Sequence, residues 1–301
     1  MNDSGATDPN VYSLVISPQE EFKFPPLEER LYRLTDDEFE FFTKKTGITD
    51  PQALKEHILH IQAEAYAICP YPCIRRFGFT GLAIARYPAY QDLLKLGRER
   101  PGALFLDVGC CFGNDVRKAV ADGFPMDQAL ACDLRPEFWN LGYKLFKDSP
   151  ESFTVPFLPG DVLDQSFLTI SSPFVTPPPS PAPLLKGLTN LTPLKGHLSA
   201  IHAAAFFHLF DEPQQLYIAK ALAGLLSPEP GSIIFGWHRG ELVKGGERFN
   251  HSADSWNEMW EKEVFKEGQV RSWAILKVAN RPDLDHITAK IYLMEWCVTR
   301  L

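Results

Sequence analysis

The sequence predicts an α/β fold, in which a helical cap precedes a mostly parallel seven-stranded sheet that ends in an antiparallel C-terminal hairpin. Three observations lead to this fold class. From residue 103 onward, apolar runs typical of buried strands alternate with helical patterns. The last two strand patterns have no helix between them, which favours an antiparallel pair. The earlier residues are mainly helical in pattern, so we expect an arm and cap over 1–100 and a core over 101–301.

Two helix starts lie in the cap region. Thr35-Asp36-Asp37-Glu38 has the spacing of a capping box. Thr49-Asp50-Pro51 opens a second helix, since proline suits the first helical turn. One face of this second helix is apolar at helical spacing, through Leu54, Ile58, Ile61 and Ala65. Residues 67–76 contain two prolines and interrupt the run, so we expect a helical cap and not an independent domain.

The core elements follow in order. Strands are expected at 104–108, 128–134, 154–158, 198–202, 232–236, 270–278 and 289–299. Helices are expected at 115–121, 136–148, 212–226 and 252–265. A proline-rich stretch, 171–181, lies within an insertion at 165–197, and its composition predicts a surface loop or flap.

Composition limits the partners. The net charge is −8, which argues against a surface that follows nucleic-acid phosphates. Six cysteines without disulfide spacing suggest reduced thiols, and Cys69 and Cys73 lack a second ligand pair, so no metal site is expected. The N-terminus has no signal-peptide pattern and no apolar run is long enough to span a membrane. We therefore expect a cytoplasmic enzyme with neither a nucleic-acid nor a membrane partner.

A glycine-bearing turn joins the first strand to its helix. Asp107-Val108-Gly109-Cys110-Cys111-Phe112-Gly113 follows an apolar run and precedes a helix start. Glycine lets a ligand approach the backbone closely, and helix N-termini favour nucleotide-type groups. The acidic residue precedes the glycines, whereas in the dinucleotide fingerprint it follows them by about twenty residues. This order indicates S-adenosylmethionine as the cofactor.

Acidic residues also end the next two strands. Asp133-Leu134 ends the second, where a carboxylate is placed to accept both ribose hydroxyls, and Asp161-Val162 ends the third, next to the expected adenine. Because ligands of open α/β sheets collect at this edge, the three elements predict one cofactor site. Arg75 or Arg76, on the cap, is a candidate partner for the cofactor's carboxylate or a substrate carboxylate. A solvated surface arginine is the alternative.

These motifs resemble those of class I S-adenosylmethionine-dependent methyltransferases, which have a Rossmann-like sheet. Asp107-x-Gly109-x-Cys111-x-Gly113 matches their first motif, except that Cys111 replaces the usual middle glycine. Asp133 and Asp161-Val162 match the ribose and adenine motifs. The segment that introduces the fifth strand, 225–231, also matches.

A narrower resemblance covers more of the chain. It rests on the segments Tyr71–Phe77, Gly109–Gly113, His197–Ala203, Phe207–Glu212 and Phe249–Ser252. These are similar to fungal methyltransferases of meroterpenoid and related secondary-metabolite pathways, in which a cysteine at the middle position is normal. The resemblance implies O-methylation, often of a carboxyl group, on a hydrophobic polyketide or terpenoid intermediate. It also implies homodimers, with the N-terminal helices covering the substrate site.

Methyl transfer mainly requires alignment of nucleophile, methyl group and sulfur. A carboxylate acceptor needs no base, whereas a phenol gains from a histidine. We expect His202, at the end of the fourth strand, to orient or deprotonate the acceptor, assisted by His208 or by His238 at the end of the fifth. The alternative is that each histidine caps a strand or satisfies a buried hydrogen bond.

Two other functions stay open. A protein or nucleic-acid methyltransferase is disfavoured, because 201–204 lacks the Asn/Asp-Pro-Pro-aromatic stretch of amino-group methylation. A cofactor-binding regulator without catalysis would also keep Asp107, Asp133 and Asp161 intact.

Overall fold

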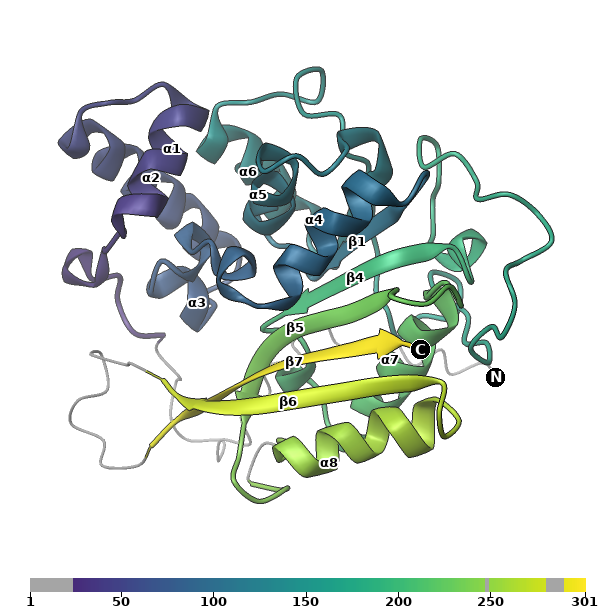
Figure 1. Ribbon diagram of the computed structural model, residues 1–301. Helices are drawn as coiled ribbons and strands as arrows, with labels where there is room; N and C mark the ends of the chain where they lie inside the picture. Colours follow the sequence, from purple (N-terminus) through teal and green to yellow (C-terminus); the bar gives the residue numbers. More distant parts are fainter. Residues whose placement is uncertain (1–23, 247–248, 280–289) are drawn as a thin grey trace, which may run out of the picture.

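Seven strands form one sheet in the order β3-β2-β1-β4-β5-β7-β6 (Figure 1). The computed structural model describes residues 24–246, 249–279 and 290–301, so the first 23 residues of the expected arm and cap and the first residue of the strand expected at 289–299 lie outside it. Strands β1 to β5 pair in parallel, and β7 pairs antiparallel with β5 and β6. The predicted fold class is therefore confirmed. The strands are β1 Leu104–Val108, β2 Ala129–Asp133, β3 Phe157–Pro159, β4 Leu198–Ala204, β5 Ile233–Gly240, β6 Val270–Val278 and β7 Tyr292–Arg300.

Helices cover both faces of the sheet. The α-helices are α1 Asp36–Thr46, α2 Pro51–Ile68, α3 Pro72–Arg75, α4 Ala89–Glu99, α5 Asn114–Ala121, α6 Pro136–Phe146, α7 Glu212–Leu225 and α8 Ala253–Glu258. Short 3-10 helices are η1 Glu29–Leu31, η2 Gly78–Thr80, η3 Ala83–Arg86, η4 Met126–Gln128, η5 Thr192–Leu194 and η6 Phe207–Leu209. The helix expected at 252–265 forms as α8 followed by a π-helix, η7 Met259–Val264.

Alternating side chains divide the core into two layers, because successive residues of a strand point to opposite faces. On one face, Phe105 and Ala200 pack with α4, α5 and Trp139 of α6. On the other, Ile201 and Ala203 pack with α7 and α8. Figure 1 shows the same arrangement, with α4, α5 and α6 on one side of the sheet and α8 on the other.

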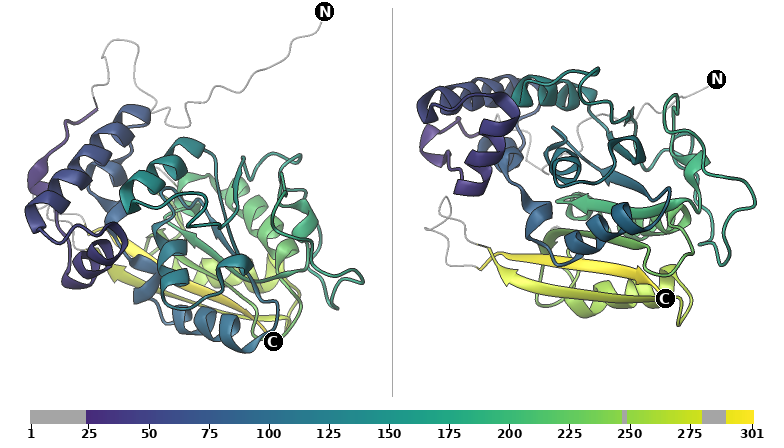
Figure 2. Two further views of the ribbon diagram at one scale, coloured as in Figure 1. Left: turned by 90° about the horizontal axis from the view of Figure 1, so that it is seen from above. Right: turned by 45° about the horizontal axis from the view of Figure 1, so that its top comes forward.

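The cap packs against the core through a shared apolar cluster. Thr35 and Glu38 form the predicted capping box at the start of α1. Phe42 of α1 stacks on Phe146 of α6 at a ring-centroid distance of 5.3 Å, and Figure 2 shows α1 and α2 beside α6. Phe112, from the turn after β1, belongs to the same cluster. The division between a cap over 1–100 and a core over 101–301 stays a prediction.

Two strands are longer than the sequence indicated, which moves two histidines away from strand ends. Strand β4 continues past His202 to Ala204, and β5 continues past Gly236 and His238 to Gly240. Gly236 does not end its strand. It lies where a Cβ would meet the carbonyl oxygen of Ala203 at 2.1 Å, so glycine permits close pairing there.

The proline-rich insertion links β3 to β4 without regular strand structure. Its stretch 171–181 contains neither helix nor strand, as expected. It is nevertheless attached to the sheet, because Arg300 of β7 donates a hydrogen bond to the carbonyl oxygen of Phe174 at 2.8 Å. Phe174 and Pro178 also cover Gly196.

Candidate active site

The turn after β1 has a tightly bonded backbone. The amides of Gly109 and Cys110 donate to the carbonyl oxygen of Cys132 on β2, at 2.9 and 3.1 Å, and the amide of Gly113 donates to the carbonyl oxygen of Cys110 at 2.7 Å. Gly109, Cys111 and Gly113 have φ values of 66°, 51° and 69°. Cys111 therefore adopts the left-handed conformation that a glycine would hold without strain.

Glycine is required at both ends of this turn by neighbouring side chains as well as by φ. A Cβ on Gly109 would lie 2.7 Å from the ring of Phe206, which follows β4. A Cβ on Gly113 would lie 2.5 Å from Trp139 of α6. The turn is thus enclosed between α6 and the segment after β4.

Asp133, at the end of β2, stabilises the turn through hydrogen bonds to its backbone. One carboxylate oxygen accepts a hydrogen bond from the amide of Cys111 at 2.8 Å, and the other accepts from the amide of Arg135 at 2.9 Å. Burial raises the pKa of Asp133, although these two amide donors and the Arg135 charge oppose the shift. Each oxygen keeps a further lone pair, so the carboxylate can still accept ribose hydroxyls.

Asp107 and His202 form a buried pair on neighbouring strands. His202 Nδ1 lies 2.8 Å from Asp107 Oδ1, and the residues are 0% and 2% exposed. Among the described residues, neither Asp107 Oδ2 nor His202 Nε2 has a hydrogen-bond partner. Burial lowers the pKa of His202, but its hydrogen bond to Asp107 and the two nearby carboxylate charges outweigh this, so the pKa is raised overall.

The three predicted histidines are divided between the two faces of the sheet. His202 was expected at the end of β4 but lies inside the strand, on the face that α5 covers and that Asp107 shares. His238 lies on the opposite face, inside β5, with its Nδ1 accepting a hydrogen bond from Trp296 Nε1 at 2.9 Å. His208 lies in η6, and its charge acts on His238. The geometry therefore brings His208 and His238 together and separates both from His202.

A fourth histidine, His251, joins the group around His238. Trp256 contacts both rings, at centroid distances of 4.5 Å to His238 and 5.3 Å to His251. Burial is the main cause that lowers the pKa of His238 well below its usual range and that of His251 to about 4. Sequence analysis did not select His251. The available signal was its position just before the capping serine Ser252 of α8.

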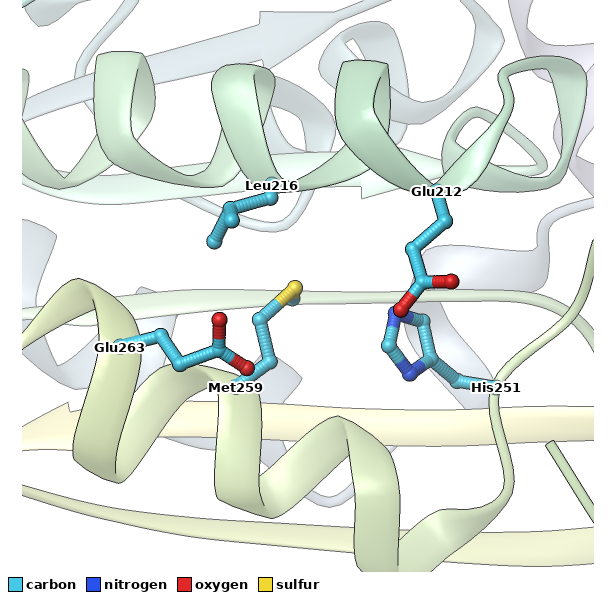
Figure 3. Close-up of a pocket in the computed structure, with 5 residues that line it drawn as sticks. All are labelled: Glu212, Leu216, His251, Met259 and Glu263. Carbon is cyan, nitrogen blue, oxygen red and sulfur yellow. The ribbon is translucent and has the colours of Figure 1, made fainter.

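His251 also lines a small cleft between α7 and the π-helix (Figure 3). Its other lining residues are Glu212, Leu216, Met259 and Glu263. His251 Nδ1 lies 2.9 Å from Ser255 Oγ, while Glu212 points toward the same ring in Figure 3. Both carboxylates sit at the exposed mouth.

The remaining predicted cofactor residues lie beyond β2 and β3. Leu134 is 52% exposed, and Asp161 is exposed with Oδ1 accepting from the amide of Leu163 at 2.9 Å. Val162 is buried in the core layer under α7. On the cap, Arg75 is held by Glu28 and by the carbonyl oxygen of Pro26, whereas Arg76 is the C-cap residue that follows α3. Leu134 and Asp161 are thus the accessible members of this set.

Sequence analysis also missed Arg117, a fully buried cation beneath the turn. Its Nη1 donates to the carbonyl oxygen of Phe112 at 2.8 Å, and its Nε and Nη2 donate to the two carboxylate oxygens of Asp148. A basic residue one turn after the last glycine was the only local signal. Its partner lies 31 residues away.

The described ranges contain neither a group of side chains that could hold a metal ion nor a helix that could span a membrane. No group of three or more histidine, cysteine, aspartate or glutamate side chains there is arranged to hold a metal ion. Over the same ranges, every helix is too short or too polar to cross a membrane.

Known proteins resemble this chain in both its cap and its core. A family model for the meroterpenoid methyltransferase N-terminal domain matches residues 27–80. The Asnovolin E/Chermesin D methyltransferase nvfJ of Aspergillus novofumigatus is 36% identical over 216 residues, which cover 69% of each chain. The O-methyltransferase phiE of Fungal sp. (strain ATCC 74256) is 32% identical, covering 72% of this chain and 68% of that protein.

Among solved structures, an S-adenosylmethionine dependent methyltransferase from Mesorhizobium loti aligns with a TM-score of 0.45 and 12% identity, over 72% of this chain and all (100%) of that one. The two fungal relatives are matched along most of their length, with substantial identity. This chain therefore belongs to the family of methyltransferases that includes these fungal secondary-metabolite enzymes.

Proposed function

We propose that this protein transfers a methyl group from S-adenosylmethionine to a carboxyl oxygen of a hydrophobic polyketide or terpenoid intermediate. Membership of the methyltransferase family supports the reaction class, and one relative is named for the compounds asnovolin E and chermesin D. The observation that carries the cofactor assignment is Asp107. Its Oδ2 is buried without a partner among the described residues, directly before the turn in which Gly109, Cys111 and Gly113 have positive φ.

The residues present fit this cofactor. Asp107 Oδ2 would accept a hydrogen bond from the ammonium group, and Asp133 would accept from the ribose hydroxyls. Asp161 offers an exposed carboxylate for an adenine amino group, and Leu134 an exposed apolar surface for the ring face. When bound, S-adenosylmethionine supplies an electrophilic methyl group on a sulfonium sulfur. Arg76, on the cap, is the proposed partner of the cofactor's carboxylate.

The state of the histidines favours a carboxylate acceptor over a phenol. His238 Nδ1 accepts from Trp296, so the basic nitrogen of the neutral ring is already occupied. Burial keeps the pKa of His238 and His251 low, which makes both weak bases. A carboxylic acid is already ionised at neutral pH and needs no base. We infer that His208 and His251 orient the acceptor and that His238 mainly supports the aromatic packing.

The test combines calorimetry with a methyl-release assay. Wild-type protein should bind S-adenosylmethionine, and Asp107→Asn should weaken that binding at least tenfold, which corresponds to about 1.4 kcal/mol. Matched acceptors that present a carboxyl or a phenol on the same apolar skeleton then distinguish the two reactions. No cofactor binding would refute the proposal. Binding without turnover on any such acceptor would indicate a regulator, and faster methylation of the phenol would refute the carboxyl assignment.

The resemblance also implies homodimers, which we propose as the state in solution. Light scattering coupled to size-exclusion chromatography measures it directly. A mass near 34.0 kDa, that of one chain, at all concentrations would contradict a dimer.

A further inference from the structure

Three titratable side chains are buried together on the α5 side of the sheet. Asp107 of β1 and His202 of β4 are direct partners in the β1–β4 register, so their side chains share one face. The β5 partner of His202 is Phe235, whose ring lies 4.9 Å away from the imidazole. Asp115 of α5 covers this row and is 8% exposed. The proposed function uses Asp107 but gives no role to His202 or Asp115.

The position of His202 argues against contact with the methyl acceptor. The ring is fully buried between β1, β5 and α5, and the pairing with Asp107 uses Nδ1. Ala203, the next residue, points to the opposite face, where His238 and the aromatic side chains lie. His202 therefore lies on the same face of the sheet as Asp107, opposite His238.

We infer that His202 is a positioning residue for the cofactor: by donating from Nδ1 to Asp107 Oδ1, it directs Asp107 Oδ2 toward the ammonium group of the cofactor's amino-acid part. This inference rests on the proposed function. Without that donor, the carboxylate would be free to rotate toward the amides of the turn. Oδ2 is buried without a hydrogen-bond partner among the described residues, so it is the carboxylate oxygen left to accept from the ammonium group.

Charge in the cluster is consistent with a cationic ligand group. Asp107 from β1 and Asp115 from α5 supply two carboxyl groups, while the neighbour from β5, Phe235, is uncharged. Asp115 accepts a hydrogen bond from the amide of Ile84 at 3.3 Å, and Arg86 of η3, which also pairs with Glu38, acts on it with a positive charge. The two carboxyl groups therefore give the cluster an acidic character that suits an ammonium group.

The variants His202→Asn and His202→Gln test the position of the donor. The asparagine amide nitrogen lies near the place of Nδ1 and retains the hydrogen bond to Asp107, whereas glutamine reaches near the place of Nε2. Both are polar, so neither leaves a large apolar group against the carboxylates. We expect His202→Asn to bind S-adenosylmethionine within about threefold of wild type and His202→Gln to lose about tenfold or more, 1.4 kcal/mol.

Two cofactor analogues distinguish a specific effect on the ammonium group from a general loss of cofactor binding. Decarboxylated S-adenosylmethionine keeps the ammonium group, whereas 5′-methylthioadenosine lacks it. Calorimetry should show that His202→Gln weakens the first and leaves the second within about threefold of wild type. Equal affinities of the two variants for S-adenosylmethionine, or equal losses for both analogues, would overturn the inference. Failure of the wild type to bind S-adenosylmethionine would instead refute the proposed function.

Discussion

Replacing Arg117 by methionine should strongly destabilise the protein, because the guanidinium contacts Phe112 in the turn after β1, Asp148 and Phe153. The side chain is 0% exposed and its ion pair with Asp148, 17% exposed, has distances of 2.8 and 3.0 Å. Its Nη1 also supports the carbonyl oxygen of Phe112. The ring of Phe153 lies 4.3 Å from the guanidinium carbon, so the cation is stacked as well as paired.

The magnitude follows from what Arg117→Met leaves behind. Methionine fills part of the volume, but Asp148 loses its cation and the Phe112 carbonyl loses its donor. Breaking a buried ion pair by removing one partner costs about 3–5 kcal/mol. Because Asp148 keeps some contact with water, we expect the lower end, about 3 kcal/mol. At roughly 2–4 °C per kcal/mol, the Tm should fall by roughly 6–12 °C.

Thermal unfolding followed by circular dichroism measures this effect, and Lys118→Met is the matched control. Lys118 is the next residue of α5 and pairs with Asp122 at 2.6 Å near the surface. Exposed pairs of this kind contribute about 0–1 kcal/mol, so the control should lose little. Equal Tm losses in the two variants would refute the reasoning that burial makes the Arg117 pair important.

Three further substitutions test other parts of the structure. Gly113→Ala should lower the Tm more than Gly102→Ala, because both glycines have φ near 70° but only Gly113 has neighbours within 4 Å of an added Cβ; equal losses would contradict this. Burial raises the pKa of Asp115 to about 6, so its ionisation costs stability as pH rises from about 4 through 6. In urea unfolding, Asp115→Asn should therefore have a higher free energy of unfolding than wild type at pH 8 but not at pH 4.5. A gain at both pH values would contradict the role given to the ionisation of Asp115. Trp296→Phe leaves His238 Nδ1 without its donor and should cost about 1–3 kcal/mol in the same assay, whereas an unchanged midpoint would show that the bond is unimportant.

The turn after β1 could be predicted from sequence because its signals are local. Strand β1, the glycines and the start of α5 lie within one continuous segment, and β1 has the bounds expected, Leu104–Val108. The same holds for the capping box of α1, whose partners Thr35 and Glu38 are three residues apart. In both places, backbone geometry and side-chain chemistry are set by near neighbours in the chain.

The histidine positions depend on pairing between distant segments, which the sequence does not show. His202 and Asp107 are 95 residues apart, and they meet only because β1 and β4 adopt one particular register. The strands also extend beyond the apolar runs that predicted them, because β5 includes polar residues such as His238. A buried role for His238 required its distant partner Trp296, 58 residues further on.

The cysteine that replaces the usual glycine is explained by the cap. The side chain of Cys111 packs against the apolar cluster that the cap shares with α6, while its amide holds Asp133. The next residue, Phe112, stacks on Phe79 of the cap at 4.6 Å. A glycine at position 111 would adopt the positive φ without strain, but it would remove one of the contacts between the cap and the turn. The cap therefore contacts the turn directly through residues 111 and 112, and its packing constrains the side chain at residue 111.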